Sequence, residues 1–293
     1  MDDDGLAYDN LPPLRDIIAT HNLSASRKFG QNFILDLNIT RRIAQAAGDL
    51  TNCDIIEIGA GPGGLTRSLL AEGARKLIVI EADRRFMPAL EQIAAAYPNR
   101  LEIIIADALK LNPNKLTPHP YRIVANLPYN IATPLLINWL YGGFDGDKWA
   151  PRFKSLTLMF QKEVANRIIA QCGTKNYGRL SVLTNWLGET RKIFEVDKQV
   201  FVPPPKVTSA LVEIIPRATP IAAMPDMVAQ ITRAAFGQRR KMLRVALKQI
   251  CSDPRALLAQ AKLDETIRAE QVDIIGFCSL ANLIADDKIN KGD

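Results

Sequence analysis

Histidine and cysteine are scarce in this chain of 293 residues. It contains two histidines, His21 and His119, and four cysteines, which are Cys53, Cys172, Cys251 and Cys278. None of them occurs in a CxxC or HxxxH spacing, so we expect neither a zinc site nor any other metal site. Scattered cysteines give no support to a disulfide framework and are typical of a protein that stays in a reducing cytoplasm.

Long apolar runs are also missing. The apolar stretches have the length of strands and are interrupted by charge, whereas a membrane-spanning helix needs about 20 apolar residues. The chain begins with the acidic segment Met1-Asp2-Asp3-Asp4, unlike the basic start of a signal peptide. We therefore expect an unexported cytoplasmic protein without membrane contact. Its net charge of +6 is compatible with an anionic partner such as nucleic acid.

Apolar runs alternate with helical patterns through the middle of the chain. Strands that are apolar throughout and separated by helices indicate a parallel sheet covered on both faces, and hence an α/β fold. Two later strands, joined without a long helix, could pair as a hairpin at the sheet edge. The predicted strands are 55–58, 77–80, 101–106, 121–125, 156–160, 192–196 and 209–215, and the predicted helices are 14–21, 38–47, 65–71, 84–96, 134–140 and 163–169.

The strand pattern ends near residue 216, and helical patterns follow it over residues 227–235, 241–250 and 256–261. We therefore predict two domains, an α/β domain over residues 1–216 and a smaller all-α domain over residues 217–293. Residues 217–250 carry seven basic side chains against one acidic side chain. This segment is either a solvated helix face or a surface that contacts nucleic acid.

A glycine-rich turn follows the strand predicted at residues 55–58. Gly59, Gly61 and Gly64 fit the spacing G-x-G-x-x-G, in which glycine permits a sharp turn and a close approach of the backbone to a ligand. The next strand is followed by Glu81, whose carboxylate can accept both hydroxyls of a ribose. A cofactor that contains a nucleoside is therefore expected, and both NAD and S-adenosylmethionine meet this description.

Two further strand ends favour S-adenosylmethionine. Asp107 follows the third strand and could hold the adenine amino group of the cofactor, although a helix or turn cap is the alternative. The fourth strand leads into Asn126-Leu127-Pro128-Tyr129, where a dehydrogenase would need an acid/base partner. An amide oxygen beside an aromatic face suits a planar base with an exocyclic amino group, such as adenine or cytosine. An ordinary turn is the alternative.

Five motifs occur in a characteristic order along the chain. They are KFGQNF at 28–33, EIGAGPGGLT at 57–66, NLPY at 126–129, FVPPPKVTS at 201–209 and FGQRRK at 236–241. Together they resemble the ribosomal RNA adenine N6-dimethyltransferase family. The likeness is greatest to its bacterial small-subunit branch, which dimethylates two neighbouring adenines in a hairpin near the 3′ end of 16S rRNA. The resemblance implies a Rossmann-like methyltransferase sheet that uses S-adenosylmethionine, a partner in 16S rRNA within the small ribosomal subunit or its precursor, and a role in ribosome biogenesis.

The resemblance also implies roles for single positions in cofactor binding. The position of Gly59 matches the backbone beside the methionine part of the cofactor, Glu81 matches the ribose ligand and Asp107 matches the adenine contact. Ile34 stands where leucine is more usual in the family. The implied cofactor contacts are Asn32, Ile34, Gly59, Glu81, Asp107 and Asn126.

The implied catalytic residues are Asn126, Leu127, Tyr129 and Phe201. Asn126 and the Leu127 carbonyl would accept the N6–H groups of the target adenine, while Tyr129 and Phe201 would stack on its two faces. The candidate RNA contacts in the second domain are Arg239, Arg240, Lys241 and Arg244, the last standing where asparagine is often found. Three alternatives stay open: a large-subunit rRNA methyltransferase of the macrolide-resistance type, an RNA-binding assembly factor without activity, and an NAD dehydrogenase.

Overall fold

Two compact units make up the chain. The structure, a computed structural model, describes residues 10–26 and 29–291, and their side chains as far as Asp286. The motif residue Lys28 and the acidic start of the chain lie outside the described residues. The first unit comprises 1–143, 151–165 and 191–215, and the second comprises 144–150, 166–190 and 216–293. The second unit thus includes segments before residue 216, and a single domain boundary at that residue stays a prediction.

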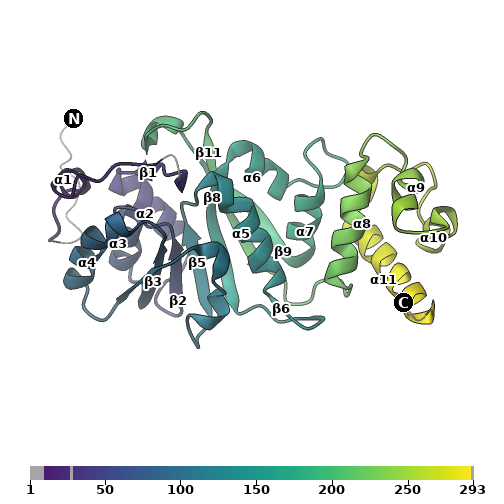
Figure 1. Ribbon diagram of the computed structural model, residues 1–293, viewed down its shortest axis with the longest axis horizontal. Coiled ribbons are helices and arrows are strands. Elements are labelled where there is room, and N and C mark those ends of the chain that lie inside the picture. Colours follow the sequence, from purple (N-terminus) through teal and green to yellow (C-terminus); the bar gives the residue numbers. More distant parts are fainter. Residues whose placement is uncertain (1–9, 27–28, 292–293) are drawn as a thin grey trace. The chain divides into compact units, whose positions relative to one another are not determined.

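The first unit is built on a sheet with the strand order β4-β3-β2-β5-β8-β11-β9 (Figure 1). Strands β4, β3, β2, β5 and β8 run parallel, and β11 runs antiparallel to β8. The predicted parallel α/β sheet is confirmed, as is the position of the last two strands beside each other at one edge. The strands are β2 (Asp54–Ile58), β3 (Lys76–Glu81), β4 (Leu101–Ile105), β5 (Tyr121–Ala125), β8 (Phe153–Gln161), β9 (Gly188–Val196) and β11 (Ser209–Pro216).

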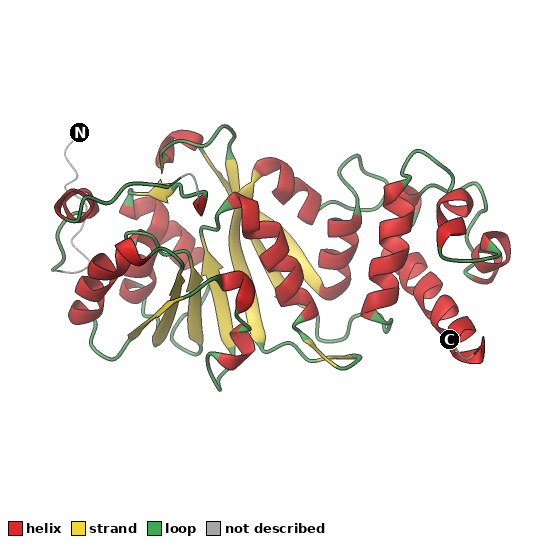
Figure 2. Cartoon of the chain, in the orientation of Figure 1, coloured by secondary structure: helices red, strands yellow, loops and turns green. Residues whose placement is uncertain are grey.

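Helices alternate with these strands, as the sequence pattern predicts (Figure 2). Helix α3 packs against β3, α4 against β4 and α5 against β8. The α-helices of this part of the chain are α1 (Leu14–Thr20), α2 (Leu37–Ala46), α3 (Gly64–Ala71), α4 (Met87–Ala96), α5 (Tyr129–Tyr141) and α6 (Lys162–Ile168). Short 3-10 helices are η2 (Arg84–Phe86), η3 (Ala108–Lys110), η4 (Pro113–Lys115) and η5 (Lys198–Val200).

Helix α5 begins five residues earlier than predicted. Proline is common at the first helical position, which favoured a start at Pro134. The helix instead starts at Tyr129 and contains Pro134, and it buries Ala132 and Leu135 against the rest of the unit. Burial of this apolar face compensates for the one helical hydrogen bond that proline cannot donate. The earlier start puts Tyr129 in the first turn of a helix.

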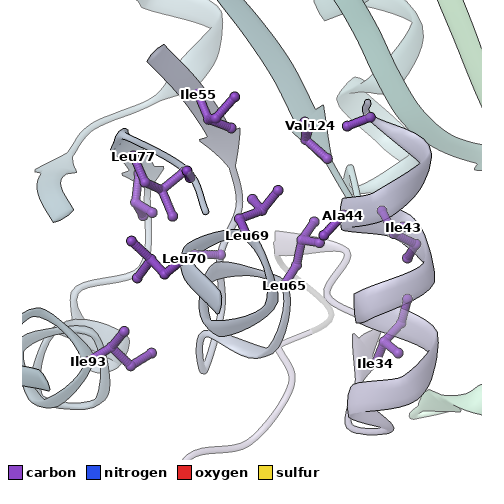
Figure 3. Close-up of a cluster of buried hydrophobic side chains, with 14 of the residues drawn as sticks. Ile34, Ile43, Ala44, Ile55, Leu65, Leu69, Leu70, Leu77, Ile93 and Val124 are labelled. Carbon is purple, nitrogen blue, oxygen red and sulfur yellow. The ribbon is translucent and has the colours of Figure 1, made fainter. Parts of the chain in front are cut away.

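A cluster of buried apolar side chains joins helices α2 and α3 to the sheet (Figure 3). In Figure 3, Leu65 and Leu69 of α3 lie between Ile55 of β2 and Ile43 of α2. Burial of each such side chain contributes about 1.5–3 kcal/mol. Because the cluster lies directly behind the turn that follows β2, it fixes the position of that turn.

A short antiparallel ladder joins two segments that are distant in sequence. Strand β1 (Phe33–Ile34) pairs with β10 (Phe201–Val202), with Ile34 opposite Phe201. Neither strand was predicted, because two residues are too few to show a period of alternation. The ladder brings the KFGQNF motif beside the FVPPPKVTS motif.

The second unit is mainly helical and also contains the two-residue strands β6 (Phe144–Asp145) and β7 (Lys148–Trp149). The predicted helix over 241–250 is shorter and is followed by a 3-10 turn, and α7 was not predicted. Its helices are α7 (Arg179–Leu187), α8 (Pro225–Gly237), α9 (Leu243–Ala246), η6 (Leu247–Gln249), α10 (Pro254–Gln260), η7 (Ala269–Gln271) and α11 (Ile274–Lys291). No described helix combines the length and the apolar character needed to cross a bilayer.

Candidate functional site

A cleft opens at the carboxyl ends of the parallel strands in the first unit. Its empty volume, including the part open to solvent, is about 960 Å³. The turn after β2, the ends of β3 and β4, and the residues after β5 line it. Residues 29–34, here named the cleft loop, form a further part of the lining. Ligands of open parallel sheets bind at this edge.

Glycine shapes the floor of the cleft. Gly59 and Gly61 have φ values of +73° and +53°, in the left-handed region that favours glycine. A Cβ atom on Gly61 would lie 2.8 Å from Cε1 of Phe33, which is closer than side-chain contacts allow. The turn can therefore pass under the cleft loop only with glycine at this position, and it leaves backbone rather than side chains facing the cleft.

Glu81 is held as a hydrogen-bond acceptor at the end of β3. Its Oε2 accepts the N–H of Gly61 at 2.9 Å, and its Oε1 accepts the N–H of Asp83 at 2.8 Å. Burial raises the pKa of Glu81 above its usual value, although these two backbone donors oppose the shift. Each oxygen keeps a second lone pair that can accept a hydroxyl. This arrangement could accept the hydroxyls of a ribose, and the ribose role of Glu81 stays a prediction.

Glu57 is a buried ionisable residue of the cleft that the sequence analysis did not single out. It is 1% exposed and accepts a hydrogen bond of 2.7 Å from the hydroxyl of Thr66. Burial, and to a smaller extent the nearby charge of Glu81, raises the pKa of Glu57 to about 8, although the Thr66 bond opposes the shift. The signal in the sequence is a carboxylate among the isoleucines of strand β2.

Asn126 follows β5 and is half-buried in the cleft wall. Its Nδ2 donates a hydrogen bond of 2.9 Å to the backbone carbonyl of Asn32 in the cleft loop. Because a carbonyl can only accept, this bond fixes which end of the amide is the NH2 group. Oδ1 is therefore left available as an acceptor. Leu127 is 2% exposed and also lines the cleft.

The two aromatic residues expected to stack on the target base are placed differently. Tyr129 lines the cleft, and its hydroxyl is hydrogen-bonded to the hydroxyl of Ser209 at 2.6 Å, so the ring is anchored. Phe201 is 1% exposed and belongs to the apolar core, opposite Ile34 in the β1–β10 ladder. The structure therefore does not bring Phe201 to the cleft, because a phenyl ring without a polar group gains most from burial.

The remaining residues expected to contact the cofactor all line the cleft. Asp107 is exposed, and its Oδ1 accepts the N–H of Leu109 at 3.0 Å, so it caps η3 while it also faces the cleft. The two interpretations of Asp107 are therefore compatible. Asn32 donates from its side chain to the carbonyl of Gly30 at 3.2 Å. Ile34 is buried at the end of the cleft loop. Their roles in binding stay predictions.

The four candidate RNA contacts of the second unit fall into two pairs. Arg239 donates to the carbonyl of Lys175 at 2.8 Å and lies 3.7 Å from a carboxylate oxygen of Glu270. Arg239 and Arg244 form the pair that contacts the protein itself.

Arg244 is half-buried and forms an ion pair of 3.3 Å with Glu265. Arg240 and Lys241 are exposed. Arg240 and Lys241 are therefore the pair that is more accessible to an anionic partner.

Comparison with known proteins gives matches over most of the chain. The family model described as "Ribosomal RNA adenine dimethylase" matches residues 22–286. A curated relative, "Ribosomal RNA small subunit methyltransferase A" of Azorhizobium caulinodans, is 54% identical over 280 residues, which cover 94% of this chain and 94% of the relative.

Two solved structures are also similar. A dimethyladenosine transferase from Plasmodium falciparum has a TM-score of 0.70 and 26% sequence identity, and the match covers 88% of this chain and 97% of the other. The structure of "23S rRNA methyltransferase ErmE" has a TM-score of 0.64 and 27% identity, with 87% of this chain and 100% of the other covered. The similarity thus extends over nearly the whole length of the chain.

Proposed function

This chain belongs to the ribosomal RNA adenine dimethylase family, and from that premise we propose that it dimethylates N6 of two neighbouring adenines near the 3′ end of 16S rRNA. The methyl donor is S-adenosylmethionine. The observation that carries the proposal is the amide of Asn126, whose Oδ1 is oriented as an acceptor in a cleft that also contains the ribose-binding geometry of Glu81.

The residues of the cleft fit the cofactor. Glu81 offers two carboxylate oxygens that are fixed by backbone donors and keep lone pairs for the ribose hydroxyls. The exposed carboxylate of Asp107 suits the adenine amino group. The backbone of Gly59, whose φ of +73° favours glycine, is proposed to lie beside the methionine part.

The cofactor supplies an electrophilic methyl group on a sulfonium sulfur. The protein must present the N6 nitrogen of adenine, whose lone pair is delocalised into the ring. In the first transfer Asn126 Oδ1 and the Leu127 carbonyl would accept one N6–H each, and in the second the single remaining N6–H would bond to one of them, so the nitrogen can become tetrahedral and direct its lone pair at the methyl carbon. Orientation of this kind can contribute about 7–11 kcal/mol. The same two oxygens stabilise the positive charge that develops on N6. In each transfer the new N6–C bond replaces the S–C bond, S-adenosylhomocysteine is the leaving group and N6 loses one proton to solvent.

The target adenine must leave its stack to enter the cleft, at a cost of a few kcal/mol. Stacking on the anchored ring of Tyr129 offsets about 1–3 kcal/mol of this cost. Phe201 can supply the second face only if its ring leaves the core position that it has here. Stacking by Phe201 would therefore require β10 to rearrange when RNA binds.

RNA contact outside the cleft is proposed for the basic segment of the second unit. Arg240 and Lys241 are the exposed members and can neutralise phosphates directly. Arg239 and Arg244 belong to the same proposed surface, but their side chains are bonded to the protein itself. The proposed substrate is 16S rRNA within the small subunit or its precursor, and the proposed location is accordingly the cytoplasm.

Methylation of large-subunit rRNA is the second candidate, favoured by the similarity to the 23S rRNA methyltransferase structure. That identity is 27%, against 54% for the small-subunit relative. The experiment is transfer of labelled methyl groups from S-adenosylmethionine to unmethylated small subunits and, in parallel, to large-subunit rRNA. We expect two dimethylated adenines in the small subunit. Label in large-subunit rRNA alone would favour the second candidate, and binding without transfer would favour an assembly factor.

A further inference from the structure

The side chain of Gln31 ties the cleft loop to the end of strand β3. Its Nε2 donates to Oδ2 of Asp83 at 3.2 Å, and its Oε1 accepts the backbone N–H of Ser26 at 2.8 Å. Gln31 is half-buried and lines the cleft. One amide thus holds the base of the loop through one end and a carboxylate on another element through the other end.

Asp83 is a firmly held partner for this amide. It is 5% exposed, and the guanidinium of Arg85 contacts both of its carboxylate oxygens, at 3.0 Å and 2.6 Å. Hydrogen bonds from Arg85 and Gln31 hold the pKa of Asp83 below its usual value, so it is ionised at neutral pH. A hydrogen bond to an ionised acceptor is stronger than one between neutral groups. The Gln31 contact is therefore of the kind that can hold a loop in place.

The same contact connects the loop to the ribose-binding carboxylate. The backbone N–H of Asp83 donates to Oε1 of Glu81 at 2.8 Å. The cleft loop, Asp83 and Glu81 are thus joined by a continuous set of hydrogen bonds. The second half of the loop is tied elsewhere, through the Asn32 carbonyl and the β1–β10 ladder. Gln31 supplies the corresponding tie for the first half.

We propose that Gln31 is a positioning residue that keeps the cleft loop closed over bound S-adenosylmethionine by its hydrogen bond to Asp83. The inference rests on the proposed function, since it takes that cofactor as the ligand. Loss of the bond allows the loop to open more often while the groups that contact the cofactor remain. The effect is therefore expected in the rate at which the cofactor dissociates rather than in the presence of binding.

The test is the dissociation rate of labelled S-adenosylmethionine from the full chain, chased with excess unlabelled cofactor. For Gln31→Ala we expect a rate about tenfold higher than that of the parent, as suits loss of a hydrogen bond to a charged group. The matched control is Gln45→Ala. Gln45 also donates from Nε2 to a carboxylate, Oε2 of Glu72, at 3.3 Å, but it lies on α2 and outside the lining of the cleft. Its dissociation rate should equal that of the parent.

A second pair of variants, made in the protein that carries Asp83→Asn, separates the effect of the Gln31–Asp83 hydrogen bond from a general structural effect. In Asp83→Asn, where the acceptor is neutral, adding Gln31→Ala should change the rate less than it does in the parent. Amide hydrogen exchange in residues 29–34 of the cofactor-bound protein should also be faster in Gln31→Ala and unchanged in Gln45→Ala. A dissociation rate for Gln31→Ala within twofold of the parent, or an equal effect of Gln31→Ala in the parent and in Asp83→Asn, would overturn the proposed role of Gln31. If the parent itself does not bind S-adenosylmethionine, the proposed function fails instead.

Discussion

The side-chain NH2 group of Asn126 donates to the backbone carbonyl of Asn32 at 2.9 Å. These residues are 94 positions apart in the sequence. The bond joins the residue proposed to accept the target N6–H to the loop proposed to close over the cofactor. An amide held in this way presents Oδ1 without having to reorient when the substrate arrives, and such preorganisation lowers the barrier to reaction.

Substitution of Asn126 tests the role of its amide oxygen. In Asn126→Ala the N6 acceptor is lost, so we expect methyl transfer to fall by at least about 100-fold, the size typical of losing one preorganised polar group. Binding of S-adenosylmethionine should remain measurable, because Glu81 and Asp107 are unchanged. Single-turnover transfer at saturating cofactor measures the first, and calorimetry measures the second. Turnover near that of the parent would contradict the mechanism.

Phe201 allows the core role and the stacking role to be separated. Leucine is apolar and nearly fills the space of phenylalanine, so Phe201→Leu should cost less than about 1.5 kcal/mol of the free energy of unfolding. It lacks an aromatic face. If the ring leaves the core to stack on the flipped adenine, Phe201→Leu should lower RNA methylation about tenfold or more while urea unfolding changes little. Unchanged methylation would restrict Phe201 to the core.

The raised pKa of Glu57 predicts a pH dependence of stability. Below pH 4.5 the carboxyl is protonated in both the folded and the unfolded chain, and its contribution to stability is complete. As the pH rises to about 8, the unfolded chain releases this proton while the folded chain retains it. The free energy of unfolding therefore falls, by up to ~1.4 kcal/mol per pH unit.

The substitution that isolates this effect is Glu57→Gln, which is neutral at every pH and nearly the same size. Relative to the parent, it should become more stable as the pH rises from 4.5 to about 8, with no further gain above that range. Urea unfolding at a series of pH values measures the difference. Glu81 contributes a slope of the same sign to both proteins, because its pKa is also raised. Parallel curves for the two proteins would rule out Glu57 as the source.

Charge reversal at Arg240 and Lys241 tests the proposed RNA surface. Both side chains are exposed. The double variant Arg240→Glu with Lys241→Glu should weaken RNA binding and reduce the slope of log affinity against log salt by about 1.4–1.8, at about 0.7–0.9 for each of the two lost phosphate contacts.

The matched control makes the same change in net charge elsewhere. Lys115→Glu with Lys154→Glu alters two exposed lysines near the starts of β5 and β8, at the sheet edge opposite the cleft. Binding to small-subunit rRNA across a range of salt concentrations should then be close to that of the parent. If both double variants lose affinity equally, net charge rather than a specific surface explains the effect.

Much of the fold and of the site could be predicted because it depends on short-range patterns. The strands of the parallel sheet are rich in apolar residues, such as Ile55 and Ile56 in β2 and Ile123 and Val124 in β5, and the carboxyl ends of parallel strands meet at one edge. Polar residues that directly follow such strands, such as Glu81 and Asn126, must therefore lie near each other. Glycine in the turn after β2 announces the left-handed backbone that the structure shows at Gly59 and Gly61.

The sequence by itself thus determined the class of fold, the edge of the sheet at which the cleft opens and most residues of the cleft. Only the tertiary structure decided how residues far apart in the chain are coupled. The orientation of the Asn126 amide depends on a carbonyl in the cleft loop, and the raised pKa of Glu57 depends on complete burial. The burial of Phe201 depends on pairing with Ile34 across the β1–β10 ladder. These properties arise from packing between distant segments, which leaves no periodic signal in the sequence.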